Sequence, residues 1–218
     1  MRCLINMIPK VERSHHHIRI TKEAKGDILW WVDGLDFFHG TTLFVSDVPL
    51  PSYVFSCDAC EKGAGMHFNN DWAYFAWEID CPEYAGKHIN ILELKAVVLA
   101  AERWGSQWAG LHILVRTDNM ATVAAVIKTS SRSPELLELI RQLFWLSVIY
   151  NFKITAKYIP GVENVMSDRI SRLTSVSAAS DVISLLTGVE MGTVFCAGHM
   201  THQSYMYLQT NWRMGSVS

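Results

Sequence analysis

Four carboxylates occupy positions where acidic side chains carry chemical meaning. Asp58 lies in a core-like apolar run (YVFSCDA), and Glu93 lies in another (ILEL). Asp118 directly follows a hydrophobic run, and Asp168 lies in a short segment further along the chain. A charge in an apolar run is costly unless a partner compensates it. A hard divalent cation with oxygen ligands is such a partner, and two ions about 4 Å apart support phosphodiester hydrolysis.

Each carboxylate also has a simpler interpretation. A helix cap accounts for Asp118, a surface ion pair with Arg169 accounts for Asp168, and exposure to solvent accounts for Glu93. Asp58 is the hardest to explain in this way, because aspartate is disfavoured within strands. Composition and periodicity leave both interpretations open, whereas the order of the four along the chain favours the metal site.

The pattern of apolar residues predicts the elements that position these side chains. Short runs of β-branched and aromatic residues, separated by turn residues at 61–63 and 69–71, predict three antiparallel strands at 53–59, 63–68 and 72–78. A buried run predicts a further strand at 111–117, and a fifth strand is predicted at 153–159. Helices are predicted at 21–38, where apolar residues follow helical periodicity, and at 89–104, 119–128, 134–150 and 163–172. The predicted fold is α/β, a mixed five-stranded sheet of three antiparallel strands followed by αβ units, with helices packed on it. If strands 53–59 and 111–117 are neighbours, the sheet brings Asp58 and Asp118 together.

Composition limits the classes of partner. The chain has 218 residues, a net charge of -2 and 50% hydrophobic residues, so a strongly basic nucleic-acid-binding surface is not expected overall. Between residues 128 and 172 the balance is +3, which fits either a phosphate-contacting surface or ordinary solvated helices. Five irregularly spaced cysteines predict a reducing intracellular compartment, cytoplasmic or nuclear. No apolar run reaches the roughly 18 residues needed to span a bilayer, so no membrane partner is expected.

Two cysteine patterns resemble metal sites but lack ligands. Cys57 and Cys60 form a single CxxC without a second pair, and Cys57 is predicted to pack in the core. In the tail, Cys196, His199 and His202 lack a fourth ligand at finger spacing, so no site is predicted there.

Four segments together carry a family resemblance: SCDACEKGAG, HINILELKAV, VRTDNMATVAAV and YIPGVENVMSDRISR. From about Tyr53 to Arg172 the chain resembles the ribonuclease H domain of retroelement reverse transcriptases of the DIRS-like, tyrosine-recombinase type. The preceding TKEAKGDILWWVDGL is similar to the connection segment that follows the polymerase in such polyproteins. The resemblance implies a ribonuclease H-like fold at 51–174, after an arm and connection-like helix at 1–50 and before a tail of unknown role at 175–218.

The resemblance also implies an activity and its residues. It implies a two-metal nuclease that cleaves the RNA strand of RNA–DNA hybrids with Mg²⁺ or Mn²⁺. Its catalytic and metal-binding residues would be Asp58, Glu93, Asp118 and Asp168. Asp58 would bridge both ions, Glu93 and Asp118 would hold one, and Asp168 would hold the other. A hybrid is distinguished by 2′-hydroxyls on one strand only.

The implied partners are the hybrid and a polymerase domain of the parent polyprotein. The candidate substrate-binding residues are Asn119, Arg116, Asn164 and Tyr158. Tyr158 stands where the family often has a histidine, ten residues before Asp168. Because tyrosine cannot supply an imidazole near neutral pH, slower turnover is expected.

Two rival functions use the same fold. One is a decayed, non-catalytic module that binds nucleic acid or a protein. The other is a DNA strand-transfer enzyme, which usually has three carboxylates in a different order and which the ELK of the first long helix fits poorly. Fold alone does not separate these functions, because function resides in the site.

Overall fold

The computed structural model describes residues 17, 19–35, 51, 53–69 and 71–173. The chain divides into two compact units, Met1–Leu43 and Phe44–Ser218. The tail 175–218, with its cysteine and histidines, lies outside the described residues, as does much of the arm at 1–50. No described helix is both long and apolar enough to cross a membrane.

The first unit contains helix α2, Lys22–Leu35, and the last three residues of the predicted helix lie outside the described residues. Thr21 caps it, since its hydroxyl accepts a hydrogen bond from the Ala24 amide at 3.2 Å. The periodic apolar side chains Ile28 and Val32 are exposed. The sequence pattern therefore located the helix correctly. Its periodic apolar residues are not the buried ones, because Ala24 is buried instead.

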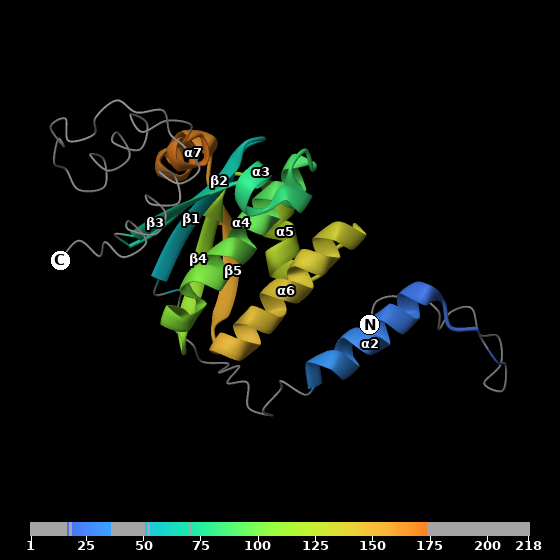
Figure 1. Cartoon of the computed structure of the whole chain (residues 1–218). Helices are drawn as coiled ribbons and strands as arrows, with labels where there is room; N and C mark the ends of the chain where they lie inside the picture. The colour runs from blue at the N-terminus through green and yellow to red at the C-terminus, as the bar shows by residue number, and fades with distance from the viewer. Residues whose placement is uncertain (1–16, 18, 36–50, 52, 70, 174–218) are drawn as a thin grey trace, which may run out of the picture. The chain divides into compact units, whose positions relative to one another are not determined.

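The second unit is built on five strands, β1 Tyr53–Ala59, β2 Gly63–Phe68, β3 Asp71–Ala76, β4 His112–Thr117 and β5 Lys153–Tyr158. Their order in the sheet is β3-β2-β1-β4-β5. The pairs β1–β2 and β2–β3 are antiparallel. The pairs β1–β4 and β4–β5 are parallel (Figure 1). The predicted mixed sheet is confirmed, including the adjacency of β1 and β4.

The third strand ends two residues before its predicted boundary because the chain turns into a short helix, α3, Trp77–Asp80. The Asp80 carboxylate accepts a hydrogen bond from the Ala76 amide at 2.8 Å, which closes this turn. The Trp77 indole donates to the Cys60 carbonyl at 2.8 Å and fixes the turn against the end of β1.

Helices α4 Ile89–Trp104, α5 Met120–Lys128 and α6 Pro134–Tyr150 follow the predicted segments closely. Asn119 caps α5, and Ser133 caps α6 with Pro134 at its first turn. The core lies between α4 and the sheet, where Phe55 stacks on Trp108 at a centroid distance of 5.2 Å. Cys57 is fully buried in this core, as predicted.

The last helix, α7 Val165–Ser171, packs against β1, β2 and β3. Successive residues of a strand point to opposite faces, so Asp58 lies on the face opposite to Cys57 and the core. The Ser171 hydroxyl of α7 donates to Asp58, which places α7 on that second face. A short 3₁₀ turn at Gly161–Glu163 precedes α7.

Gly65 allows α7 to approach the sheet closely, and an alanine there should loosen the domain. An added Cβ would lie 2.2 Å from the Ser171 nitrogen and 2.4 Å from the Ser167 carbonyl oxygen. Because both are backbone atoms, relief requires α7 to move, and overpacking of this kind costs about 1–3 kcal/mol. We expect Gly65→Ala to lower the melting temperature measured by circular dichroism. Gly26→Ala, where a Cβ meets nothing within 4 Å, is the control; an unchanged melting temperature in Gly65→Ala would contradict the expectation.

Candidate metal-binding active site

Three of the four carboxylates converge at the carboxyl end of the two central parallel strands. Asp58 is the penultimate residue of β1, and Asp118 follows the last residue of β4. Glu93 projects from the second turn of α4. One carboxylate oxygen from each lies within 4.8 Å of the others. The parallel pairing of β1 with β4 creates this convergence, because it aligns their carboxyl ends.

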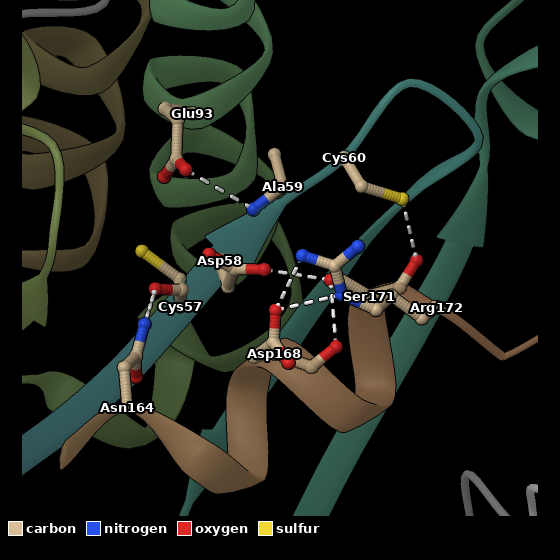
Figure 2. A network of polar contacts seen from close by, with 9 residues as sticks. All are labelled: Cys57, Asp58, Ala59, Cys60, Glu93, Asn164, Asp168, Ser171 and Arg172. Atoms are coloured by element: carbon tan, nitrogen blue, oxygen red, sulfur yellow. Dashed lines mark hydrogen bonds and ion pairs between the residues drawn. The ribbon is translucent and has the colours of Figure 1, made fainter. Parts of the chain in front are cut away.

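Hydrogen bonds fix the orientation of two of these carboxylates (Figure 2). Glu93 Oε1 accepts from the Ala59 amide at 3.3 Å. Its Oε2 accepts from the Thr117 hydroxyl at 3.3 Å. Asp58 Oδ2 accepts from the Ser171 hydroxyl at 2.6 Å. The Glu93 and Asp58 carboxylates are therefore held in place by β1, β4 and α7 rather than left to rotate freely.

The cluster is electrostatically costly as it stands. Glu93 is only 3% exposed, and burial, followed by the charges of Asp58 and Asp118, raises its pKa to about 8. Burial also raises the pKa of Asp58 to about 6, although the Ser171 hydrogen bond opposes this shift. Within the described residues no Lys, Arg or His forms an ion pair with these three carboxylates.

The donor set matches a hard divalent cation. All three ligands are carboxylate oxygens, the type that Mg²⁺ and Mn²⁺ prefer, and a cation would compensate the buried charge. The cluster opens into a cleft of about 780 Å³, which leaves room for a substrate beside the ion. The cleft is lined by Asp58, Ala59, Cys60, Glu61, Lys62, Ile89, Glu93, Asp118, Asn119, Asp168 and Arg172.

Asp168 lies at the cleft but outside the three-carboxylate cluster. Its Oδ1 accepts hydrogen bonds from Arg172 Nε and pairs with Arg172 Nη2, both at 2.7 Å (Figure 2). The alternative that the sequence left open, a surface ion pair, is thus present, with Arg172 one turn later instead of Arg169. Asp168 therefore faces the cleft with a cation already bound to one of its oxygens.

Replacing Arg172 by glutamine should strengthen the binding of divalent cations. The guanidinium competes for Asp168, and it adds positive charge near Asp58. We expect Arg172→Gln to lower the Mn²⁺ dissociation constant by a few-fold in isothermal titration calorimetry. Arg141→Gln removes the same charge from a helical ion pair with Glu138 and should leave Mn²⁺ binding unchanged. Weaker Mn²⁺ binding in Arg172→Gln would show that Arg172 supports the site rather than competes for it.

The four candidate substrate-binding residues are placed differently. Asn119 lines the cleft, and its amide donates to Asn90 Oδ1 at 2.9 Å. Asn164 is 2% exposed, and its amide donates to the Cys57 carbonyl at 2.9 Å, so it supports β1 from beneath the site. Arg116 is exposed on β4, and Tyr158 is exposed at the end of β5; neither lines the cleft.

Sequence reasoning missed Ser171 and Asn90. Ser171 lies three residues after Asp168 and therefore on the same side of α7, a spacing that could have pointed to it. Asn90 gave no signal, because an asparagine in the first turn of a helix is ordinary. Its place beside Asn119 depends on the packing of α4 against α5.

No protein-family model matches the chain, and no curated protein matches it. Similar solved structures include the LC11 ribonuclease H1 in complex with an RNA/DNA hybrid, a protein isolated from compost. The identity is 16%, the TM-score is 0.42, and the match covers 55% of this chain and 93% of that one.

Two further solved structures are similar. For the N-terminal RNase H domain of a Mycobacterium tuberculosis protein, fused to maltose binding protein, the identity is 15%, the TM-score is 0.39, and coverage is 60% of this chain and 99% of that one. For RNase H1 from the halophilic archaeon Halobacterium salinarum, the identity is 12%, the TM-score is 0.39, and coverage is 54% and 92%. At these identities and scores the likenesses do not assign an activity to this chain.

Proposed function

We propose that the chain is a metal-dependent nuclease that cleaves the RNA strand of RNA–DNA hybrids. The observation that carries this proposal is the convergence of Asp58, Glu93 and Asp118 within 4.8 Å, next to a cleft of about 780 Å³. The hybrid substrate is inferred from the resemblance of the four sequence motifs to retroelement ribonuclease H domains. The polymerase domain of a parent polyprotein is proposed as a partner on the same ground.

Each carboxylate has a proposed role that its surroundings support. Bound Mg²⁺ or Mn²⁺ ions would activate a water molecule and stabilise the leaving oxygen of the phosphodiester. Glu93 and Asp118 would hold one ion, Asp168 would hold the second, and Asp58 would contact both. The Ser171 hydrogen bond orients Asp58 for this central position, and the Ala59 amide and Thr117 hydroxyl orient Glu93.

The rim of the cleft supplies polar groups for the nucleic acid. We infer that Asn119, with Asn90 beside it, contacts the hybrid directly, because both belong to helix starts near the acidic cluster. Asn164 would act by positioning, since its amide holds the β1 carbonyl next to Asp58. Tyr158 would leave product release without an imidazole, so we propose slow turnover. The proposed catalytic domain is 51–174, with 1–50 as its connection-like segment.

The test is cleavage of a labelled RNA–DNA hybrid by the full chain, with Mg²⁺ or Mn²⁺ and with EDTA. We expect cutting of the RNA strand only, dependent on metal and lost in Asp118→Asn. Duplex DNA and single-stranded RNA of the same sequence serve as substrate controls. Cutting of duplex DNA in preference to the hybrid would reject the proposed substrate. Cutting that persists in EDTA would reject the proposed dependence on a metal ion.

A binding module without activity is the second candidate function. Tyr158 in place of the family histidine and the pairing of Asp168 with Arg172 favour it. A folded wild-type chain that binds the hybrid but does not cut it, even with Mn²⁺ and excess protein, would support this module and reject the nuclease.

A further inference from the structure

A row of side chains crosses the sheet next to the acidic cluster. In the strand register Ser56 of β1 lies opposite Arg116 of β4, and Arg116 lies opposite Lys157 of β5. Directly opposed residues of neighbouring strands point to the same face of the sheet. Ser56, Arg116 and Lys157 therefore lie side by side on one face, and we call these three residues the basic row.

The basic row lies on the face that carries Asp58. Val115 and Ala156, the neighbours of Arg116 and Lys157 in sequence, are buried in the core shared with α4. Strand alternation therefore turns Arg116 and Lys157 to the opposite face. Asp58 also points to that opposite face, where it meets Ser171 of α7.

Arg116 and Lys157, the two cations of the basic row, have no acidic partner among the residues that the structure describes. Arg116 and Lys157 are both exposed, and neither side chain forms a hydrogen bond or ion pair with any residue that the structure describes. Like charges directly opposite each other on neighbouring strands are destabilising. An anion bound between them would remove this repulsion, and the Ser56 hydroxyl offers a further donor.

The basic row also lies at a regular spacing from the acidic cluster along the strands. Ser56 precedes Asp58 by two residues, and Arg116 precedes Asp118 by two, so the Cα atoms of each pair lie about 6.6 Å apart along the strand direction. This separation is comparable with the direct distance between adjacent phosphates of one nucleic-acid strand, which is longer than the rise along the helix axis. A backbone with one phosphate at the carboxylates would thus present its neighbour to the row.

We propose that Ser56, Arg116 and Lys157 form a phosphate-binding row that holds the nucleic-acid backbone one step from the cleavage position. The inference rests on the proposed nuclease function and adds to it a contact surface outside the cleft. In this proposal Asp58 and Asp118, at the ends of β1 and β4, bind cations. Ser56 and Arg116, two residues earlier on the same strands, bind the phosphate anion.

The test is binding of a fluorescent RNA–DNA hybrid, measured by anisotropy over a range of salt concentrations. All variants carry Asp118→Asn so that the hybrid is not cut. We expect Lys157→Glu and Arg116→Glu each to weaken binding about tenfold, as for the loss of a charged hydrogen bond. We also expect the slope of log affinity against log salt to fall by about one for each residue.

Lys153→Glu is the matched control. Lys153 lies on the same strand and the same face as Lys157, four residues nearer the other end of β5, and is also exposed. It should leave affinity and salt slope close to the parent values. Melting temperatures of all variants show whether each one is folded.

The outcomes separate this inference from the nuclease itself. Equal effects of Lys157→Glu and Lys153→Glu, or no effect of either, would overturn the basic row, while cleavage by wild type in parallel would leave the nuclease standing. A wild type that cuts no hybrid and an Asp118→Asn parent that binds none would overturn both. Selective weakening by Lys157→Glu and Arg116→Glu, with the control unchanged, would establish the row.

Discussion

Replacement of Asp58 by asparagine should reduce metal-dependent cleavage of the hybrid by at least about 10²–10³-fold, the loss typical when an enzyme loses a central electrostatic group. Asp58 lies between Glu93 and Asp118 on one side and α7 on the other, so its loss affects every proposed ion contact. Asparagine retains the shape and still accepts the Ser171 hydrogen bond, so folding should be preserved. The measurement is the single-turnover rate with Mg²⁺, supported by the Mn²⁺ dissociation constant.

The size of the loss should follow position in the cluster. Asp118→Asn should resemble Asp58→Asn, whereas Asp168→Asn should be milder and partly restored by Mn²⁺, because Asp168 lies outside the three-carboxylate group. Glu78→Gln, an exposed carboxylate beyond the cleft, controls for the removal of charge. An Asp58→Asn variant that cleaves at the wild-type rate would eliminate the proposed site.

The metal-free protein should lose stability as pH rises from about 4 to about 8. The folded-state pKa is about 8 for Glu93 and about 6 for Asp58, against ordinary values of 4.5 and 3.8. Between those limits the folded state holds protons that the unfolded state has released, so the free energy of unfolding falls with rising pH. Each pH unit is worth about 1.4 kcal/mol for a group that is fully protonated in the folded state only.

A divalent cation should reverse this trend. Because ligands must be deprotonated to bind it, stabilisation by Mn²⁺ should be largest near pH 8 and reach about 2.7 kcal/mol at a hundred times the dissociation constant. Melting curves at pH 5 to 8, with EDTA or with Mn²⁺, measure both effects. Glu93→Gln should flatten the EDTA series and raise its melting temperature at pH 8. A melting temperature that rises with pH in EDTA would show that the carboxylates are not held in the costly arrangement described.

Much of the fold follows from local signals in the sequence. Short runs of β-branched and aromatic residues between turn residues predicted the first two strands at their observed bounds, and Pro134 located the start of α6. The predicted end of β3 is wrong by two residues because a contact made elsewhere in the chain decided it. The early end of β3 depends on Trp77 reaching the Cys60 carbonyl, which no local pattern encodes.

The chemistry divides in the same way. The sequence by itself determined which residues are acidic, that Asp58 and Glu93 lie in apolar runs, and the order of the four carboxylates. Only the tertiary structure decided that three of them meet and that Asp168 pairs with Arg172 beside them. It also decided that the Asn164 amide binds the Cys57 carbonyl and that Arg116 lies opposite Lys157. The physical reason is that residue type and local period depend on near neighbours, whereas these contacts depend on strand register and on α7 packing against Gly65.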